Sequence, residues 1–309
     1  EVSDSKSVVE KLNQVKFDSF FQSSFNSNSL INNSVKSILE DTKGLIWLAT
    51  AEGVSLYDPE TNDFEDIVHN ASDQQSISGN SVNTLYMSND DVVWLGMAST
   101  GLNKFVLASQ QFAHYKHNPN NPSSLAANNI WAIEEYDENR IWVGADGKGL
   151  ELFNRKTESF EHFIHDPDNI DSVPGNRVWT ILQYSPTELW IGTYRNGVSK
   201  VDLTTWQFTH YRHNPNDPYT ISDNRIINLF KDSKGQVWVS TNNGLNVFSP
   251  STQNFRRFYH DPENFNSISE NSILNVTESK NGDIWIATYD KGINQYTPNT
   301  GKFKRYQHE

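Results

Sequence analysis

Tryptophan recurs through this chain at a nearly constant interval, and that period constrains the fold more than any other feature. The repeated residues are Trp47, Trp94, Trp142, Trp190, Trp238 and Trp285, so successive copies lie 47 or 48 residues apart. A period of this length is typical of propellers and other arrays in which each repeat packs only against its neighbours. The sequence therefore predicts six copies of one supersecondary unit.

Each copy contains short segments rich in Val, Ile, Trp, Tyr and Phe, separated by Gly, Asn and Asp. In the first copy two such segments are 46–50 and 53–58, and the turn sequence 41–44 precedes them. A later segment of most copies reads Phe-x-x-aromatic-x-His. The pattern predicts an all-β fold, a β-propeller of four-stranded antiparallel blades. Because one blade cannot bury both faces of its sheet, we expect each repeated Trp to be wedged between neighbouring blades.

The two ends of the chain predict how the ring closes. Phe17-x-x-Phe20 aligns with the pattern of a fourth strand, and the last copy ends on its own fourth strand at 303–308. One strand is left over, and three further strands after Glu309 would complete a seventh blade around it. We expect residues 1–16 to form a tether or a short helix. Residues 17–309 would form six blades plus an N-terminal closing strand of a seven-bladed ring; six closed blades with a redundant edge strand is the alternative.

Composition excludes several classes of protein. The chain has 38 Asp and Glu against 25 Lys and Arg, a net charge of −13, so it lacks the attraction on which nucleic-acid and anionic-membrane binding depend. The absence of Cys excludes disulfides and thiolate chemistry. No apolar run approaches the roughly 18 residues that span a bilayer. We therefore expect no nucleic-acid partner and no membrane insertion of this chain, and we expect any signal peptide to be absent or already removed.

A second pattern lies between the blades. It begins with His-Asn/Asp-Pro and ends with aliphatic-x-x-Asn, and it occurs at 117–128, 165–176, 213–224 and 260–271. Combined with the core Asp-x-x-Gly-x-aliphatic-Trp-aliphatic-Gly/Ala-Thr-x-x-Gly-Leu, it resembles the regulator-propeller repeats of bacterial two-component sensors over about residues 17–309. Blade four departs from this core, because it reads Ser185-Pro186-Thr187-Glu188 where Asp-x-x-Gly is usual.

The resemblance implies a place and a role for the chain. Repeats of this family form the periplasmic input region of hybrid histidine kinases and sometimes of diguanylate cyclases. Members of the family usually continue with further blades, an immunoglobulin-like domain, a membrane helix and a signalling module. Partners implied in this way are the downstream signalling domains of the same protein and a second copy in a homodimer.

Histidines and paired acids are the first candidates for chemistry. Six of the nine His occupy one repeat position, which favours a structural role in the turn over metal binding: His69, His117, His165, His213, His260 and His308. Acid pairs such as Glu134-Glu135 are expected to be solvated. We find no Ser-His-Asp pattern and no phosphate-binding Gly loop, and we expect no catalytic residue, no metal and no cofactor.

Residues that break the repeat are better candidates, because packing requires sameness whereas a ligand contacts only part of a ring. The first strands of two blades carry Trp131 and Trp179, where the other blades carry Lys36, Asn83, Ile227 and Leu274. We predict that a ligand-binding set converges on the mouth of the central channel, made of Trp131, Arg177, Trp179, Tyr194, Arg195, Arg225 and Tyr289. Such residues can stack on a sugar or bind a carboxylate. The alternative is that the Trp fill the axial hole and the Arg neutralise an acidic rim.

These observations predict a non-catalytic, extracytoplasmic sensor domain of a two-component or related signal-transduction protein. Its partner would be a small molecule or oligosaccharide, such as a glycan, or a neighbouring domain. Two alternatives remain open at this point: a propeller lyase or glycosidase, and a protein-interaction scaffold.

Overall fold

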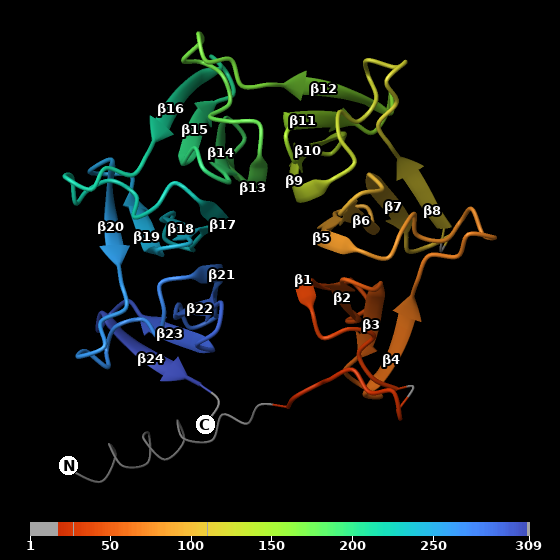
Figure 1. The fold of residues 1–309 in the computed structure, drawn as a ribbon, viewed down its shortest axis with the longest axis horizontal. Coiled ribbons are helices and arrows are strands. Elements are labelled where there is room, and N and C mark those ends of the chain that lie inside the picture. Colours follow the sequence, from red (N-terminus) through yellow and green to blue (C-terminus); the bar gives the residue numbers. More distant parts are fainter. Residues whose placement is uncertain (1–17, 27, 110, 308–309) are drawn as a thin grey trace.

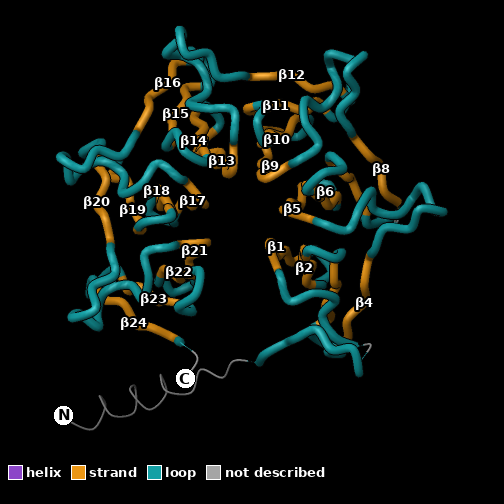
Figure 2. Tube along the Cα trace, viewed as in Figure 1, coloured by secondary structure: helices purple, strands orange, loops and turns teal. Residues whose placement is uncertain are grey.

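Six four-stranded sheets arranged around a central axis make up the molecule (Figure 1). The computed structural model describes residues 18–26, 28–109 and 111–307. Within these residues every sheet is antiparallel and consists of four strands that follow one another in the chain. The strands alternate with turns and loops throughout the ring (Figure 2). The prediction of six propeller blades is confirmed, whereas the tether or helix predicted for residues 1–16 lies outside the described residues.

The blades are numbered in chain order. Blade one contains β1 (Val35–Glu40), β2 (Ile46–Thr50), β3 (Val54–Asp58) and β4 (Asp63–Ile67). Blade two contains β5 (Val82–Ser88), β6 (Val92–Met97), β7 (Leu102–Val106) and β8 (Gln111–Tyr115). Blade three contains β9 (Ile130–Asp137), β10 (Arg140–Ala145), β11 (Gly149–Asn154) and β12 (Ser159–Phe163). Blade four contains β13 (Val178–Ser185), β14 (Glu188–Thr193), β15 (Val198–Asp202) and β16 (Gln207–Tyr211). Blade five contains β17 (Ile226–Lys231), β18 (Val237–Thr241), β19 (Gly244–Ser249) and β20 (Asn254–Phe258). Blade six contains β21 (Ile273–Glu278), β22 (Ile284–Thr288), β23 (Ile293–Thr297) and β24 (Lys302–Tyr306).

The first strand of each blade lies nearest the axis and the fourth lies at the rim (Figure 1). The start of the third strand must pass close to the end of the fourth, and the repeated Gly makes this possible. At Gly101, with φ +93°, a Cβ atom would lie 2.1 Å from the carbonyl oxygen of Tyr115. Gly197 is in the same position against Tyr211, at 2.3 Å. Only glycine tolerates both this backbone conformation and this approach.

The repeated Trp is the wedge between blades, as predicted, in five of the six copies. Trp47 packs in one cluster with Val82, Leu85 and Val93 of the next blade. The side chains of five copies are at most 2% exposed, namely Trp47, Trp94, Trp142, Trp190 and Trp238. Trp285 of blade six is the exception, because it is only half-buried and its described ring contact is with Tyr306 of the same blade.

Blades one and six do not pack against each other as the other neighbours do. The first strands contact one another in sequence from β1 through β21, and no comparable contact joins β21 to β1 among the described residues. The predicted closing strand would begin at Phe17, outside the described residues, and no strand precedes β1 in the part described. The seven-bladed ring therefore stays a prediction.

Candidate functional site

A β-bulge at the start of each first strand re-aims one side chain in every blade. In blade four, for example, Val178 pairs with Thr193 and Thr180 pairs with Gly192, so that Trp179 is skipped by the ladder. The same irregularity occurs in the other five blades. The skipped residues are those that the sequence marks as variable: Lys36, Asn83, Trp131, Trp179, Ile227 and Leu274. Bulges commonly re-aim side chains in this way next to binding sites.

Three aromatic rings of blades three and four form an arc next to the bulges of the first strands. The rings of Trp131 and Trp179 stack with centroids 5.1 Å apart and planes 28° from parallel. Trp179 also contacts Tyr194, at 4.4 Å between ring centroids. All three side chains are half-buried, so they present ring surface as well as packing surface.

Three guanidinium groups surround the ring of Tyr194. Those of Arg177, Arg195 and Arg225 lie 5.5, 5.0 and 4.9 Å from its centroid. They come from blades four and five, and distances of this size are typical of cation–π contacts. We call the residues of the arc and these three arginines the axial cluster: Trp131, Arg177, Trp179, Tyr194, Arg195 and Arg225. Six of the seven predicted site residues are thus brought together.

Tyr289 is the predicted site residue that does not join the axial cluster. It follows β22 as Tyr194 follows β14, and its side chain is 74% exposed. No ring or cation–π contact of Tyr289 occurs in the part of the chain that the structure describes. The first-strand residues of its own blade and of blade five, Leu274 and Ile227, are aliphatic, so the aromatic arc stops at blade four.

Polar residues that the sequence did not single out continue the axial cluster toward blade one. Oδ1 of Asp146 lies 3.2 Å from Nε of Arg177, and its Oδ2 accepts a hydrogen bond from Asn129 at 3.2 Å. The amide of Asn83 donates to Asn129 at 3.1 Å, and Lys36 donates to Asn83 at 3.0 Å. The available signal was the variable repeat position that Lys36 and Asn83 share with the two Trp. Asp146 is thus the acid that pairs with Arg177.

The acid pair of blade three is structural, and its expected solvation is wrong. Oε1 of Glu134 accepts the backbone N–H of Gln183 in blade four at 3.0 Å. Oε2 of Glu135 accepts the Tyr86 hydroxyl of blade two at 2.5 Å. Desolvation is the main reason that the pKa of Glu134 is raised to about 7. These carboxylates therefore connect adjacent blades.

The repeated histidines have the structural role predicted from their spacing. In each described copy the backbone N–H donates to an Asn side chain eleven residues later, and Nδ1 lies 2.7 or 2.8 Å from the carbonyl oxygen of the aliphatic residue eight positions later; these are His69, His117, His165, His213 and His260. The other three His, at 114, 162 and 210, donate from Nε2 to carbonyl oxygens of the loops between blades. Within the described residues no group of three or more His, Asp or Glu is placed to bind a metal ion.

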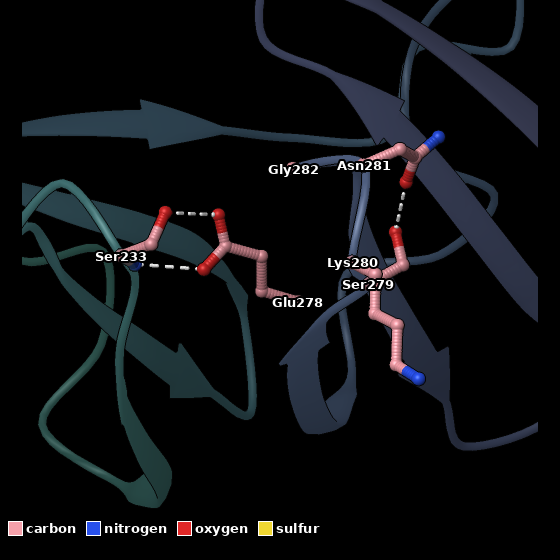
Figure 3. Close-up of a pocket in the computed structure, with 6 residues that line it drawn as sticks. All are labelled: Ser233, Glu278, Ser279, Lys280, Asn281 and Gly282. Carbon is pink, nitrogen blue, oxygen red and sulfur yellow. Dashed lines mark hydrogen bonds between the residues drawn. The ribbon is translucent and has the colours of Figure 1, made fainter.

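Two shallow cavities lie away from the axial cluster. One, of about 490 Å³, is lined by the turns of blades five and six (Figure 3). There the carboxylate of Glu278 faces Ser233 and accepts both its backbone N–H and its hydroxyl, each at 2.7 Å. Lys280 points away from this pair in the same view. Glu278 is thus already paired across the two blades, and this cavity has no converging polar groups left for a ligand.

Comparison with known families identifies the repeats. The sequence matches the two-component regulator propeller family over residues 29–52, 220–243 and 267–290, in blades one, five and six. Three segments of the chain are thus similar to two-component regulator propeller repeats. No curated protein matches this chain significantly. The described residues include no long apolar helix of the kind that crosses a membrane.

Three solved structures that resemble the chain in fold can be compared with it. The chain is 27% identical, with a TM-score of 0.76 over 91% of its length, to the extracellular domain of BT3049 from B. thetaiotaomicron, described as a hybrid two component system. It is 19% identical (TM-score 0.54, 90% of its length) to that of BT4673, described as a one component system of the same organism. It is 17% identical (TM-score 0.66, 90%) to PorZ, a surface component of the type-IX secretion system of Porphyromonas gingivalis. The last two likenesses are of fold alone. The chain spans 36%, 44% and 42% of these three structures.

Proposed function

We propose that this propeller is a non-catalytic input domain in the periplasm, and that its axial cluster binds a small ligand with a flat apolar face and an anionic group. An acidic sugar has both features. The downstream signalling domains of the same protein would then read the bound state, for which the ligand must bind one conformation more tightly than another. The resemblance to extracellular domains of two-component proteins supports the sensor role.

The asymmetry of the axial cluster carries the proposal. Packing alone would favour the same residue at the bulge of every blade, yet Trp occupies it in blades three and four only. The indole N–H of Trp131 is buried and has no hydrogen-bond partner. An unsatisfied buried donor costs about 1–3 kcal/mol. Trp94 in the core bears the same cost, so it is the restriction of the stacked Trp pair to two blades that distinguishes the pair from filling of the axial hole.

Charge at the axial cluster favours an anionic ligand. The guanidinium groups of Arg177, Arg195 and Arg225 lie around one ring, and Asp146 pairs with the first of them. This concentration of positive charge occurs in a chain whose net charge is −13. Arginine binds carboxylates and similar oxyanions through two parallel N–H donors, which adds geometric selectivity to the charge attraction.

The most direct test is a ligand screen followed by substitution at the axial cluster. Thermal-shift assays of the chain against uronic acids, neutral sugars, amino acids and organic acids would find the ligand, because binding to the folded state raises the melting midpoint. Calorimetry would then give Kd for the chain and for three variants: Trp179→Ala, Arg195→Ala and Tyr289→Ala. Tyr289→Ala is the matched control, since Tyr289 holds the same position in its blade but lies outside the cluster.

We expect the first two variants to bind about tenfold or more weakly, which corresponds to the roughly 1.4 kcal/mol or more expected of a stacking or charge-assisted contact. Tyr289→Ala should bind as the parent does. Parent-like affinity in both Trp179→Ala and Arg195→Ala would place the ligand elsewhere and remove the proposal.

A further inference from the structure

The second shallow cavity, of about 340 Å³, lies beside the loop that joins blades two and three. It is lined by residues of that loop, of the turn between β10 and β11, and of the end of β12, among them Asn121, Ser124, Ala126, Lys148 and His162. A cavity of this size is sufficient for a small ligand. Because the chain repeats, the other blades show which chemical group this position accepts.

In blades five and six an arginine of the fourth strand binds the loop that precedes its own blade. Nε of Arg305 donates to the carbonyl oxygen of Ser267 at 3.0 Å, and its Nη2 donates to that of Asn264 at 3.0 Å. Arg257 makes the same two contacts with the loop that precedes blade five. Each of these loops therefore presents carbonyl acceptors that match the fixed donor geometry of a guanidinium group.

Blade three has a histidine at the position of this arginine. His162 pairs with Glu151 of the third strand, as Arg305 pairs with Asn294. Nε2 of His162 lies 2.9 Å from the carbonyl oxygen of Pro122 and donates to it. A single imidazole N–H thus replaces the several donors of a guanidinium group.

The carbonyl groups that the arginines bind have counterparts at the cavity. Asn264 and Ser267 stand four and seven residues after the His that begins their loop, and Asn121 and Ser124 stand at the same positions of the loop before blade three. Both Asn121 and Ser124 line the cavity, and His162 donates to neither. The cavity therefore lies where blades five and six hold a guanidinium group.

A buried acid distinguishes this position of blade three. In blades two, five and six the third strand has Asn here, and its amide donates to a Ser hydroxyl of the loop, as Asn294 donates to Ser269 at 2.8 Å. Blade three has Glu151 and Ala126 in these two positions. Oε2 of Glu151 accepts the backbone N–H of Ala126 at 2.9 Å, whereas its buried Oε1 has no hydrogen-bond partner. The methyl group that replaces the Ser hydroxyl belongs to a residue that lines the cavity.

These exchanges leave the position short of positive charge. Compared with blades five and six, blade three has lost a permanent cation and gained a carboxyl group that is 0% exposed. The nearest titratable group is His162, whose Nδ1 lies 3.1 Å from Oε2 of Glu151. Lys148 also lines the cavity, but its side chain is exposed, so its ammonium group can remain in water. A buried carboxylate is stable only with a partner, and a bound cation would supply one.

We propose that this cavity binds the guanidinium group of a small ligand, with the carbonyl groups of Asn121 and Ser124 as acceptors and the carboxylate of Glu151 as the counter-charge. The ligand then makes the contacts that Arg257 and Arg305 make within the chain. This site is separate from the axial cluster, so it does not depend on the proposed function.

Butylguanidinium and butylurea are suitable probes, because they have nearly the same shape and only the first is charged. Calorimetry would measure Kd of each for the chain and for three variants: Glu151→Gln, His162→Arg and His210→Arg. His162→Arg supplies the guanidinium group from the chain itself, as in blades five and six. His210→Arg is the matched control, since His210 holds the same position in blade four but pairs with Ser199 and not with an acid.

We expect the parent to bind butylguanidinium at least about tenfold more tightly than butylurea, and Glu151→Gln to lose about tenfold in affinity for butylguanidinium. His162→Arg should bind neither probe and should melt no lower than the parent, because its own side chain fills the cavity. His210→Arg should bind as the parent does. Equal affinity of the parent for the two probes would overturn the proposal, as would parent-like binding in His162→Arg. So would the absence of butylguanidinium binding to the parent up to about 10 mM.

Discussion

At the scale of single residues, the indole N–H groups of four of the repeated Trp have a side-chain acceptor. In blades one and five that acceptor is the Asp of the Asp-x-x-Gly turn: Trp47 donates to Asp41 and Trp238 donates to Asp232, both at 2.9 Å. The other oxygen of Asp232 accepts two backbone N–H groups of its own turn. The carboxylate of Asp232 therefore stabilises both its own turn and the orientation of the Trp238 ring. Blade two has Ser88 in this position, and Nε1 of Trp94 is buried without a partner.

We predict that Asp232→Ala lowers the free energy of unfolding by about 2–3 kcal/mol, because it leaves a buried indole N–H and two backbone N–H groups without their hydrogen-bond acceptor. Urea unfolding measures the loss. Asp202→Ala is the matched control, since Asp202 also accepts two backbone N–H groups, from Thr204 and Thr205, but no indole. Equal losses in the two variants would show that the indole bond contributes nothing.

Sequence reasoning found the Trp but missed this acceptor and one buried carboxyl. Spacing revealed both the Trp and the Asp-x-x-Gly turn, yet nothing in one sequence shows which side chains meet. Glu151 is the second case. It occupies a position held elsewhere by Ser or Asn, such as Asn103, and it is fully buried with Oε1 unpaired. Its Oε2 accepts the backbone N–H of Ala126 at 2.9 Å and lies 3.1 Å from Nδ1 of His162.

Burial raises the pKa of Glu151 to about 8 from a model-compound value of 4.5. Between these values the unfolded chain has lost the proton while the folded chain keeps it, so folding takes up a proton. Stability from this group is full below about pH 4.5 and is lost as the pH rises to about 8. We predict that Glu151→Gln, which stays neutral, unfolds with the same free energy as the parent near pH 4.5 and is more stable by roughly 2–4 kcal/mol above pH 8. Urea titrations across this range, with the exposed Glu161→Gln as control, measure the difference; a pH-independent difference would contradict the prediction.

At the scale of strands and blades, the sequence predicted which segments pair but not how they are distorted. Alternation of large apolar residues and turn residues is visible in the amino-acid sequence, and it was enough to predict four strands per repeat. The β-bulge was not visible, because it depends on pairing between two strands. That bulge is what carries Trp131 and Trp179 out of the ladder, so the axial cluster was predicted from variability and not from geometry.

The Trp that packs between blades allows a prediction about the stability of the interface. Trp190 is 1% exposed and stacks on Tyr211 at 5.7 Å while its edge meets Phe248 of the next blade at 4.9 Å. Trp190→Ala should cost about 3–5 kcal/mol. Trp285→Ala removes the same side chain from a half-buried position and should cost less than half as much. Denaturant unfolding of the two variants decides this, and a Trp190→Ala loss below about 1 kcal/mol would contradict the wedge itself.

At the scale of the whole molecule, repetition made the ring predictable, whereas the predicted closure of the ring stays a prediction. A period of 47 or 48 residues fixes the number of blades, and the resemblance between copies fixes their common fold. Closure depends instead on a contact between the first and last copies, which the spacing of the repeat does not encode. In a repeat array, stability is approximately a sum of repeat terms and neighbour interfaces. Blades two to five have two such interfaces, whereas blades one and six have one each among the described residues.

This difference predicts an order of opening that hydrogen exchange can measure. Opening blade six breaks one interface, while opening blade four breaks two, so local unfolding should be easiest at the two end blades. We expect backbone amides of β22 in blade six and β2 in blade one to exchange at least tenfold faster than those of β14 in blade four, as read by mass spectrometry of peptic peptides. The comparison is restricted to second strands, because fourth strands at the rim can fray. Equal protection of the three strands would contradict this order, because the end blades would then have a second interface. A ligand bound at the axial cluster should slow amide exchange in β14 more than in β22.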